Sequence, residues 1–127
     1  MILAVLACAR PPLHREDTPE QALSEIRALW MAGDYEAFAR TRMDPDVVRE
    51  QLPTEEALRA WADEGRAYIA ERGHPDDVGK LDACLDHGTW RIDGDLAVCD
   101  VPELEAHWDP HLRRLDGRWY LTAGDGR

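Results

Sequence analysis

The sequence lacks clustered positive charge. Its 15 Lys and Arg residues stand against 26 Asp and Glu residues, which gives a formal net charge of −11. The only adjacent pair of basic residues is Arg113-Arg114. A chain with this charge repels nucleic-acid phosphates and the headgroups of anionic lipids. We therefore expect no nucleic-acid partner.

Long hydrophobic runs and abundant cysteine are also missing. The apolar run at the N-terminus is far shorter than the roughly 20 residues that a transmembrane helix needs. Three cysteines allow at most one disulfide within the chain. What is present, 44% hydrophobic residues with five Trp, is the composition of a folded protein. A chain of 127 residues is long enough to bury one core, so we expect a single domain.

The first residues, MILAVLAC, resemble the end of a bacterial lipoprotein signal, in which small or aliphatic residues precede a lipid-bearing cysteine. Val5-Leu6-Ala7-Cys8 fits this pattern loosely, although no Lys or Arg precedes Cys8 as a secretory signal requires. We interpret residues 1–17 as a signal remnant and a tether stiffened by Pro11-Pro12. This predicts lipidation of Cys8 and an extracytoplasmic, membrane-anchored protein. The alternative is a short strand or apolar tail on a cytoplasmic protein.

Capping signals predict helices from Thr18 onward. Thr18-Pro19-Glu20-Gln21 is a capping box with Pro at the first helical position, and an apolar stripe at helical spacing follows it. The stripe consists of Ala22, Leu23, Ile26, Leu29 and Trp30. Gly33 is suited to end this helix and Asp34 to cap the next one. Asp44-Pro45 and Thr54-Glu55 predict the starts of two further helices.

From Gly79 the hydrophobic pattern changes to alternation, which predicts strands. Residues 81–85 and 90–92 alternate, and the change of phase between them indicates a bulge at Gly88. Asp93-Gly94 is a hairpin signal with residues 96–101 as the returning strand. Residues 104–108 and a second hairpin around Asp116-Gly117 complete the sheet. We therefore predict one α+β domain over 18–122, with N-terminal helices packed on a curved antiparallel sheet, and a polar tail at 123–127.

Two stretches carry a family resemblance. Residues 31–35 (MAGDY) and 117–121 (GRWYL) resemble the nuclear transport factor two-like superfamily, which includes ketosteroid isomerases and polyketide cyclases. The resemblance implies a cone-like fold of cystatin-like topology, with a sheet that curls around a pocket. Many bacterial members are small exported or lipid-anchored proteins. The position that corresponds to the oxyanion-donating Tyr of the isomerases holds Ile26, which cannot donate a hydrogen bond.

Acidic residues and a histidine in the first predicted hairpin are the candidate catalytic group. Asp86, His87 and Asp100 fall there, and a carboxylate beside His87 would act as a general acid–base pair. Strict alternation places His87 on the opposite face from Asp86, so solvated strand residues are the alternative interpretation. His107 and His111 share a spacing seen in metal sites, but Asp109-Pro110 between them argues against the helix that this spacing needs. We predict no metal and no cofactor.

Cys84 and Cys99 would form a disulfide in an oxidising compartment. If Asp93-Gly94 is a two-residue turn, Cys99 faces Gly88, and Cys84 lies about 13 Å farther along the strand. This exceeds the Cα separation of about 7 Å that a disulfide allows. A different register, or a Cys84 outside the paired segment, would restore the bridge.

Aromatic residues at helical and strand spacing form either a core or the lining of a ligand pocket. Trp30, Tyr35, Trp90 and Trp119 are our pocket candidates. The patterns together favour a non-catalytic, exported or lipid-anchored domain that binds a small ligand or a protein partner. One alternative is a pocket enzyme of the isomerase or cyclase type with an Asp–His pair. Another is a cytoplasmic interaction module that forms a homodimer through its open sheet face.

Overall fold

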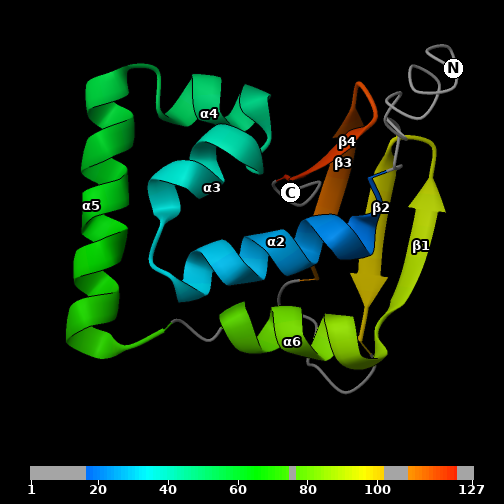
Figure 1. Ribbon diagram of the computed structural model, residues 1–127. Coiled ribbons are helices and arrows are strands. Elements are labelled where there is room, and N and C mark those ends of the chain that lie inside the picture. Colours follow the sequence, from blue (N-terminus) through cyan, green and yellow to red (C-terminus); the bar gives the residue numbers. More distant parts are fainter. Residues whose placement is uncertain (1–16, 75–76, 102–108, 123–127) are drawn as a thin grey trace, which may run out of the picture.

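The computed structural model describes residues 17–74, 77–101 and 109–122. These residues form helices followed by a four-stranded antiparallel sheet (Figure 1). The elements are α2 (Pro19–Met31), α3 (Tyr35–Thr41), α4 (Pro45–Gln51), α5 (Glu55–Arg72), α6 (Asp77–His87), β1 (Thr89–Asp93), β2 (Leu96–Asp100), β3 (His111–Leu115) and β4 (Arg118–Leu121). Helices pack on a curved sheet, so the predicted α+β class is confirmed. The lipidation candidate Cys8, the predicted strand at 104–108 and the tail at 123–127 lie outside the described residues.

Helix α2 begins with the predicted capping box. The Thr18 hydroxyl accepts a hydrogen bond from the Gln21 backbone N–H, and the Gln21 side chain accepts one from the Thr18 N–H, both at 3.1 Å. Ala22, Leu23 and Ile26 of the apolar stripe are completely buried. Burying a side chain such as Leu23 or Ile26 contributes about 1.5–3 kcal/mol. The stripe therefore places α2 at the centre of the core.

The predicted caps of the next three helices are also present. Gly33 has a φ of 72°, a left-handed conformation that glycine adopts without strain. The side chains of Asp34, Asp44 and Thr54 each accept a hydrogen bond from a backbone N–H two or three residues later. These short-range bonds fix where α3, α4 and α5 begin.

The predicted strand at residues 81–85 is wrong, because these residues lie in α6. Helix α6 buries Val78, Leu81 and Cys84, which recur every three residues, and it packs alongside α2 (Figure 1). Five residues are too few to distinguish the apolar pattern of a strand from that of a helical turn. The first and last positions of 81–85 share a face in either structure. The packing against α2 decides for the helix.

The sheet is a meander in the order β1-β2-β3-β4. Its second turn is Asp116-Gly117, as predicted, with φ values of 50° and 80° that match a type I′ turn. The first turn is Gly94-Asp95 rather than Asp93-Gly94, because Asp93 pairs with Leu96. Only the first turn residue there has positive φ, 61° at Gly94, which is the type II′ pattern. The register consequently pairs Cys99 with Trp90 instead of Gly88.

Cys84 and Cys99 form a disulfide that joins α6 to β2, with their Cα atoms 6.2 Å apart. The predicted separation of about 13 Å does not apply, because Cys84 lies on a helix outside the paired strands. Gly88 links α6 to β1 and is not part of a bulge. A Cβ atom at Gly88 would overlap the Cys99 sulfur and lie 2.7 Å from the Cys84 carbonyl oxygen. Glycine therefore lets the chain pass closely over the disulfide.

A parallel β-bridge between Met43 and Leu121 ties the helical half of the chain to β4. The Asp44 N–H donates to the Leu121 carbonyl at 2.8 Å, and the Leu121 N–H donates to the Arg42 carbonyl at 2.7 Å. The two residues that flank the bridge are charged and buried, since Arg42 is 1% exposed and Asp44 is 2% exposed. Buried charges need partners, and these partners define the first site considered below.

Candidate functional site

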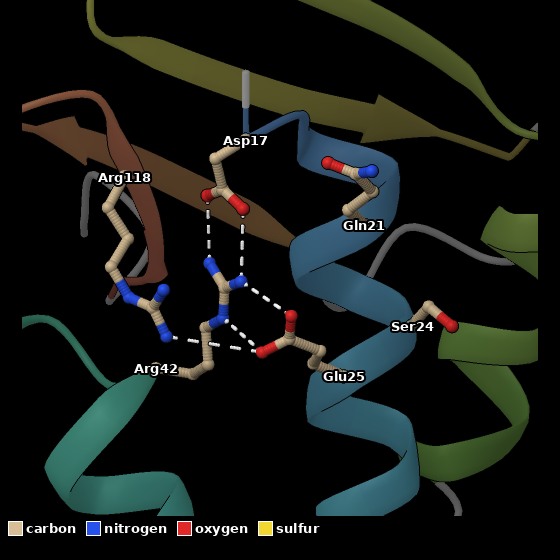
Figure 2. A pocket seen from close by; sticks show the side chains of 6 residues that line it. All are labelled: Asp17, Gln21, Ser24, Glu25, Arg42 and Arg118. Carbon is tan, nitrogen blue, oxygen red and sulfur yellow. Dashed lines mark hydrogen bonds and ion pairs between the residues drawn. The ribbon is translucent and has the colours of Figure 1, made fainter. Parts of the chain in front are cut away.

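A cleft beside α2 has a volume of about 430 Å³, and Arg42 is one of the residues that line it (Figure 2). The other lining residues are Asp17, Gln21, Ser24, Glu25 and Arg118. Two carboxylates and two guanidinium groups therefore face a single cleft. Such a set would suit a charged ligand if any of its groups had donors or acceptors to spare.

Arg42 has no donor to spare. Its Nε donates to Glu25 at 3.0 Å, and its Nη1 donates to Asp17 and to the Trp119 carbonyl, both at 2.8 Å. Its Nη2 donates to Asp17 at 3.0 Å and lies 2.9 Å from the second oxygen of Glu25. A guanidinium group carries five N–H bonds, and all of them point to partners within the chain. We therefore interpret the Arg42 cluster as a structural link between α2, α3 and β4.

The pKa shifts agree with a structural role. Burial by itself would raise the pKa of Asp17, but hydrogen bonds from Arg42 and from the Trp119 N–H outweigh it and hold this pKa below its ordinary value. Burial acts to lower the pKa of Arg42, and its hydrogen bonds to Asp17 and Glu25 raise it above the ordinary value instead. Asp17 and Arg42 therefore stay charged near neutral pH and are unsuited to exchanging protons with a substrate.

Asp44 forms a second buried cluster at the start of α4. Its carboxylate accepts hydrogen bonds from the Thr122 hydroxyl at 2.7 Å, the Asp46 N–H at 2.9 Å and Arg113 at 3.1 Å. Burial would raise the pKa of Asp44, but these three donors together lower it. The cluster holds the N-cap residue of α4 against the sheet, and Arg113 also donates to Asp46 in the first turn of α4 at 2.6 Å. These bonds fix the N-terminal end of α4.

A small apolar pocket lies where α2, α3, α4 and β4 meet. Its volume is about 240 Å³. Its lining consists of the apolar residues Trp30, Phe38, Met43, Val47 and Leu121 and the uncharged polar residues Gln51 and Thr122. Of the four pocket candidates predicted from the sequence, Trp30 is the one found here.

Trp30 carries an unsatisfied hydrogen-bond donor. Its side chain packs edge-on against Phe38, with ring centroids 5.4 Å apart, and the residue is 7% exposed. The indole Nε1 is buried and has no acceptor among the residues that the structure describes. Buried polar atoms are nearly always hydrogen-bonded in folded proteins. A donor left without a partner beside a pocket therefore calls for an explanation.

The structure separates the other predicted site residues. Trp119 is a core residue at 2% exposure, Trp90 is half-buried on β1, and Tyr35 lines a different groove on α5. Ile26 is buried in the core. The pocket residues that sequence reasoning missed, among them Met43 and Val47, carry no signal beyond their apolar character.

The predicted catalytic residues do not line the Trp30 pocket. Asp86 and His87 are exposed near the end of α6. Asp100 lies on β2, where Arg91 donates to it at 2.6 Å. A hydrogen bond and the charge of Arg91 lower the pKa of Asp100, which disfavours it as a proton carrier near neutral pH.

Comparison of the chain with protein-family models, with curated proteins and with solved structures found no match. Across the described segments, none of the helices is both long enough and apolar enough to span a membrane. The same segments contain no group of three or more His, Cys, Asp or Glu side chains arranged to hold a metal ion.

Proposed function

We propose that this protein is a non-catalytic domain that binds a small uncharged ligand in the pocket beside Trp30. The observation that carries the proposal is the buried indole N–H of Trp30, which has no acceptor in the described structure. We also propose that the chain is a member of the nuclear transport factor two-like superfamily. The α+β architecture and the sequence resemblance at residues 31–35 and 117–121 support that membership.

The energetics of Trp30 favour a ligand that brings a hydrogen-bond acceptor. A buried donor without a partner costs about 1–3 kcal/mol, and a carbonyl or ether oxygen placed next to Nε1 would recover that free energy. The pocket of about 240 Å³ has the volume of roughly eight water molecules at about 30 Å³ each. No charged side chain is present among its described lining residues. The ligand class is therefore a small, largely apolar molecule with a neutral oxygen acceptor.

Helix α4 supplies a way into the pocket. It contains no buried residue. Val47 on α4 lines the Trp30 pocket, and Val48 lines a second groove of about 510 Å³ between α4 and α5. Because α4 lies between a pocket and a groove, it makes few buried apolar contacts. Moving it away from the core therefore costs little free energy. Arg113 and Thr122 hold Asp44 at the N-terminal end of α4. We propose that this end stays fixed while the C-terminal end of α4 moves outward and exposes the Trp30 indole.

The ligand proposal is tested by following the Trp30 indole N–H in NMR spectra during titration with cyclohexanone, with methylcyclohexane as the matched probe that lacks an acceptor. We expect cyclohexanone to move the Trp30 signal downfield and to bind at least five times more tightly than the hydrocarbon. Trp30→Phe removes the donor and should abolish that preference, whereas Trp90→Phe should leave it unchanged. Equal binding of the two probes, or an unaltered preference in Trp30→Phe, would refute the proposal.

We further propose that the domain works outside the cytoplasm, anchored through a lipid on Cys8. The Cys84–Cys99 disulfide supports this address, because structural disulfides persist mainly in oxidising compartments. Expression with its native upstream sequence in a bacterial host and fractionation of the cells test the claim. We expect the protein in the membrane fraction with a diacylglyceryl mass on Cys8, and Cys8→Ser in the soluble fraction. An unmodified Cys8 in the membrane fraction would contradict the lipid anchor.

A homodimer is the second candidate arrangement. Ile92 and Leu96 lie at the tip of the β1–β2 hairpin and are 57% and 50% exposed. The register puts them on opposite faces of the sheet, because Ile92 pairs with Ala97 and Leu96 pairs with Asp93. Ile92 lies on the edge strand β1, and an exposed edge strand with apolar side chains favours association. Sedimentation equilibrium tests this: we expect a dimer for the natural chain and a monomer for Ile92→Glu, and a monomer in both would rule the dimer out.

A further inference from the structure

A further groove, distinct from the one between α4 and α5, has a volume of about 330 Å³ and is lined mainly by aromatic rings. Its lining comes mainly from α5, and α5 lies at the edge of the molecule away from the sheet (Figure 1). Its lining residues are Tyr35, Trp61, Glu64, Gly65 and Tyr68. Four of the five come from one face of α5, because positions separated by three, four and seven residues share a helix face. The groove is separate from the Trp30 pocket.

The rings are held at fixed angles to each other. Tyr35 and Trp61 meet edge to face, with centroids 5.7 Å apart and planes at 79°. Gly65 allows this arrangement, since a Cβ atom there would lie 2.6 Å from the Tyr35 ring. Tyr68 adds a third ring and is 47% exposed. The groove therefore has two perpendicular aromatic walls with a third ring open to solvent.

The electrostatics of this groove favour a cation. Aromatic ring faces attract cations, and the Arg72 guanidinium, 5.6 Å from the centroid of Tyr68, is a charge of the chain itself that a bound cation would displace from this ring. Glu64 places an exposed carboxylate among the rings. Burial and then the negative charge of Asp77 raise the pKa of Tyr35, so a second carboxylate acts on the same groove. The net charge of −11 adds a long-range attraction for cations.

We propose that the groove formed by Tyr35, Trp61, Glu64 and Tyr68 binds a small quaternary ammonium ion. A primary ammonium group carries three N–H donors that need acceptors, and Glu64 is the one carboxylate in the described lining. A trimethylammonium group has no N–H to satisfy, and its methyl groups make contact with ring faces while its charge interacts with Glu64. The ligand class is therefore of the choline type.

NMR titration with choline chloride tests the proposal, with ethanolamine as the matched primary amine. We expect choline to shift the Trp61 indole and Gly65 amide signals with a dissociation constant in the millimolar range, and ethanolamine to bind at least ten times more weakly. Tyr68→Leu should weaken choline binding about two- to fivefold, the loss of one exposed cation–π contact. Glu64→Gln should weaken it and reduce its dependence on salt.

Tyr120→Leu is the matched control. Tyr120 also lies beneath an arginine, with the Arg118 guanidinium 5.9 Å from its ring centroid, but it is on β4. This variant should bind choline as the natural protein does. Because Tyr68 is largely exposed, Tyr68→Leu should remain folded, which circular dichroism checks. Equal affinities for choline and ethanolamine, equal effects of Tyr68→Leu and Tyr120→Leu, or no shift at Trp61 would each overturn the proposal.

Discussion

Breaking the Cys84–Cys99 disulfide should lower the free energy of unfolding by about 3 kcal/mol. The two cysteines are 15 residues apart in sequence, and closing a loop of about 15 residues removes roughly 3 kcal/mol of chain entropy from the unfolded state at 25 °C. This corresponds to a change of about 100-fold in the folding equilibrium. For a domain of this size it also lowers the melting temperature by roughly 10 °C.

Both sulfurs are out of reach of solvent, since Cys84 is 2% exposed and Cys99 is completely buried. A reductant added to the folded protein therefore acts only after the chain opens, so the reduced form has to be prepared by unfolding, reduction and refolding. Urea denaturation followed by Trp fluorescence then compares the oxidised and reduced forms in a Cys8→Ser background. At a slope of about 1.5 kcal/mol/M, the midpoint should fall by about 2 M urea on reduction.

A double variant, Cys84→Ala with Cys99→Ala, should unfold near the reduced form and should not respond to reductant. Alkylation under denaturing conditions counts the free thiols of the oxidised protein and should find none in the Cys8→Ser background. Two free thiols after oxidative refolding would refute the disulfide. Oxidised and reduced forms of equal stability, within about 0.5 kcal/mol, would refute the loop-entropy argument.

Three further predictions follow from the charged clusters and from α4. Arg42→Met should lower the free energy of unfolding, measured by urea denaturation, by about 2–3 kcal/mol, because it leaves the carboxylate of Asp17 without its partner. The same change at the exposed Arg66 should lower it by less than about 0.5 kcal/mol. Equal losses in the two variants would contradict the structural role of Arg42. The pKa values of Asp17 and Asp44 lie below 3.8 in the folded state, so their stabilisation is present above pH 3.8 and is lost as the pH falls through the lower, folded values. Urea denaturation between pH 2 and 7 should show this loss, with a shallower fall in Asp44→Asn, and an unchanged profile would refute it. Amides of α4 should exchange hydrogen faster than those of α2; equal protection would contradict a movable α4.

Helix caps and the second turn could be predicted from the sequence because their signals are local. The Thr18 capping box, the left-handed Gly33 and the Asp116-Gly117 turn each depend on groups within about four residues of one another. The order of helices before strands likewise sufficed for the α+β class, since each pattern needs an opposite surface on which to bury its apolar face. The first hairpin turn was misplaced by one residue, because Gly94 is acceptable at either turn position.

The candidate pocket was only partly predictable. Trp30 stood out as an aromatic residue on a buried stripe, but its neighbours Met43 and Leu121 come from segments far along the chain. A ligand pocket depends on which distant side chains leave space between them, and no local pattern encodes that space. The Asp86–His87–Asp100 hypothesis placed all three residues on one hairpin. Asp86 and His87 instead lie in helix α6, so the assumed arrangement is wrong.

The sequence by itself determined the starts of α2, α3, α4 and α5, the second hairpin and the α+β class, because local hydrogen bonds and hydrophobic period decide these. The tertiary structure alone decided three other features. Residues 81–85 are helical because their apolar face packs on α2. Cys84 reaches Cys99 because the fold brings this helix to β2, with the two Cα atoms 6.2 Å apart. Arg42, of a residue type usually found at the surface, is buried because Asp17 and Glu25 approach it from 25 and 17 residues away in the chain. Each depends on contacts between distant segments, which exist only once the chain has folded.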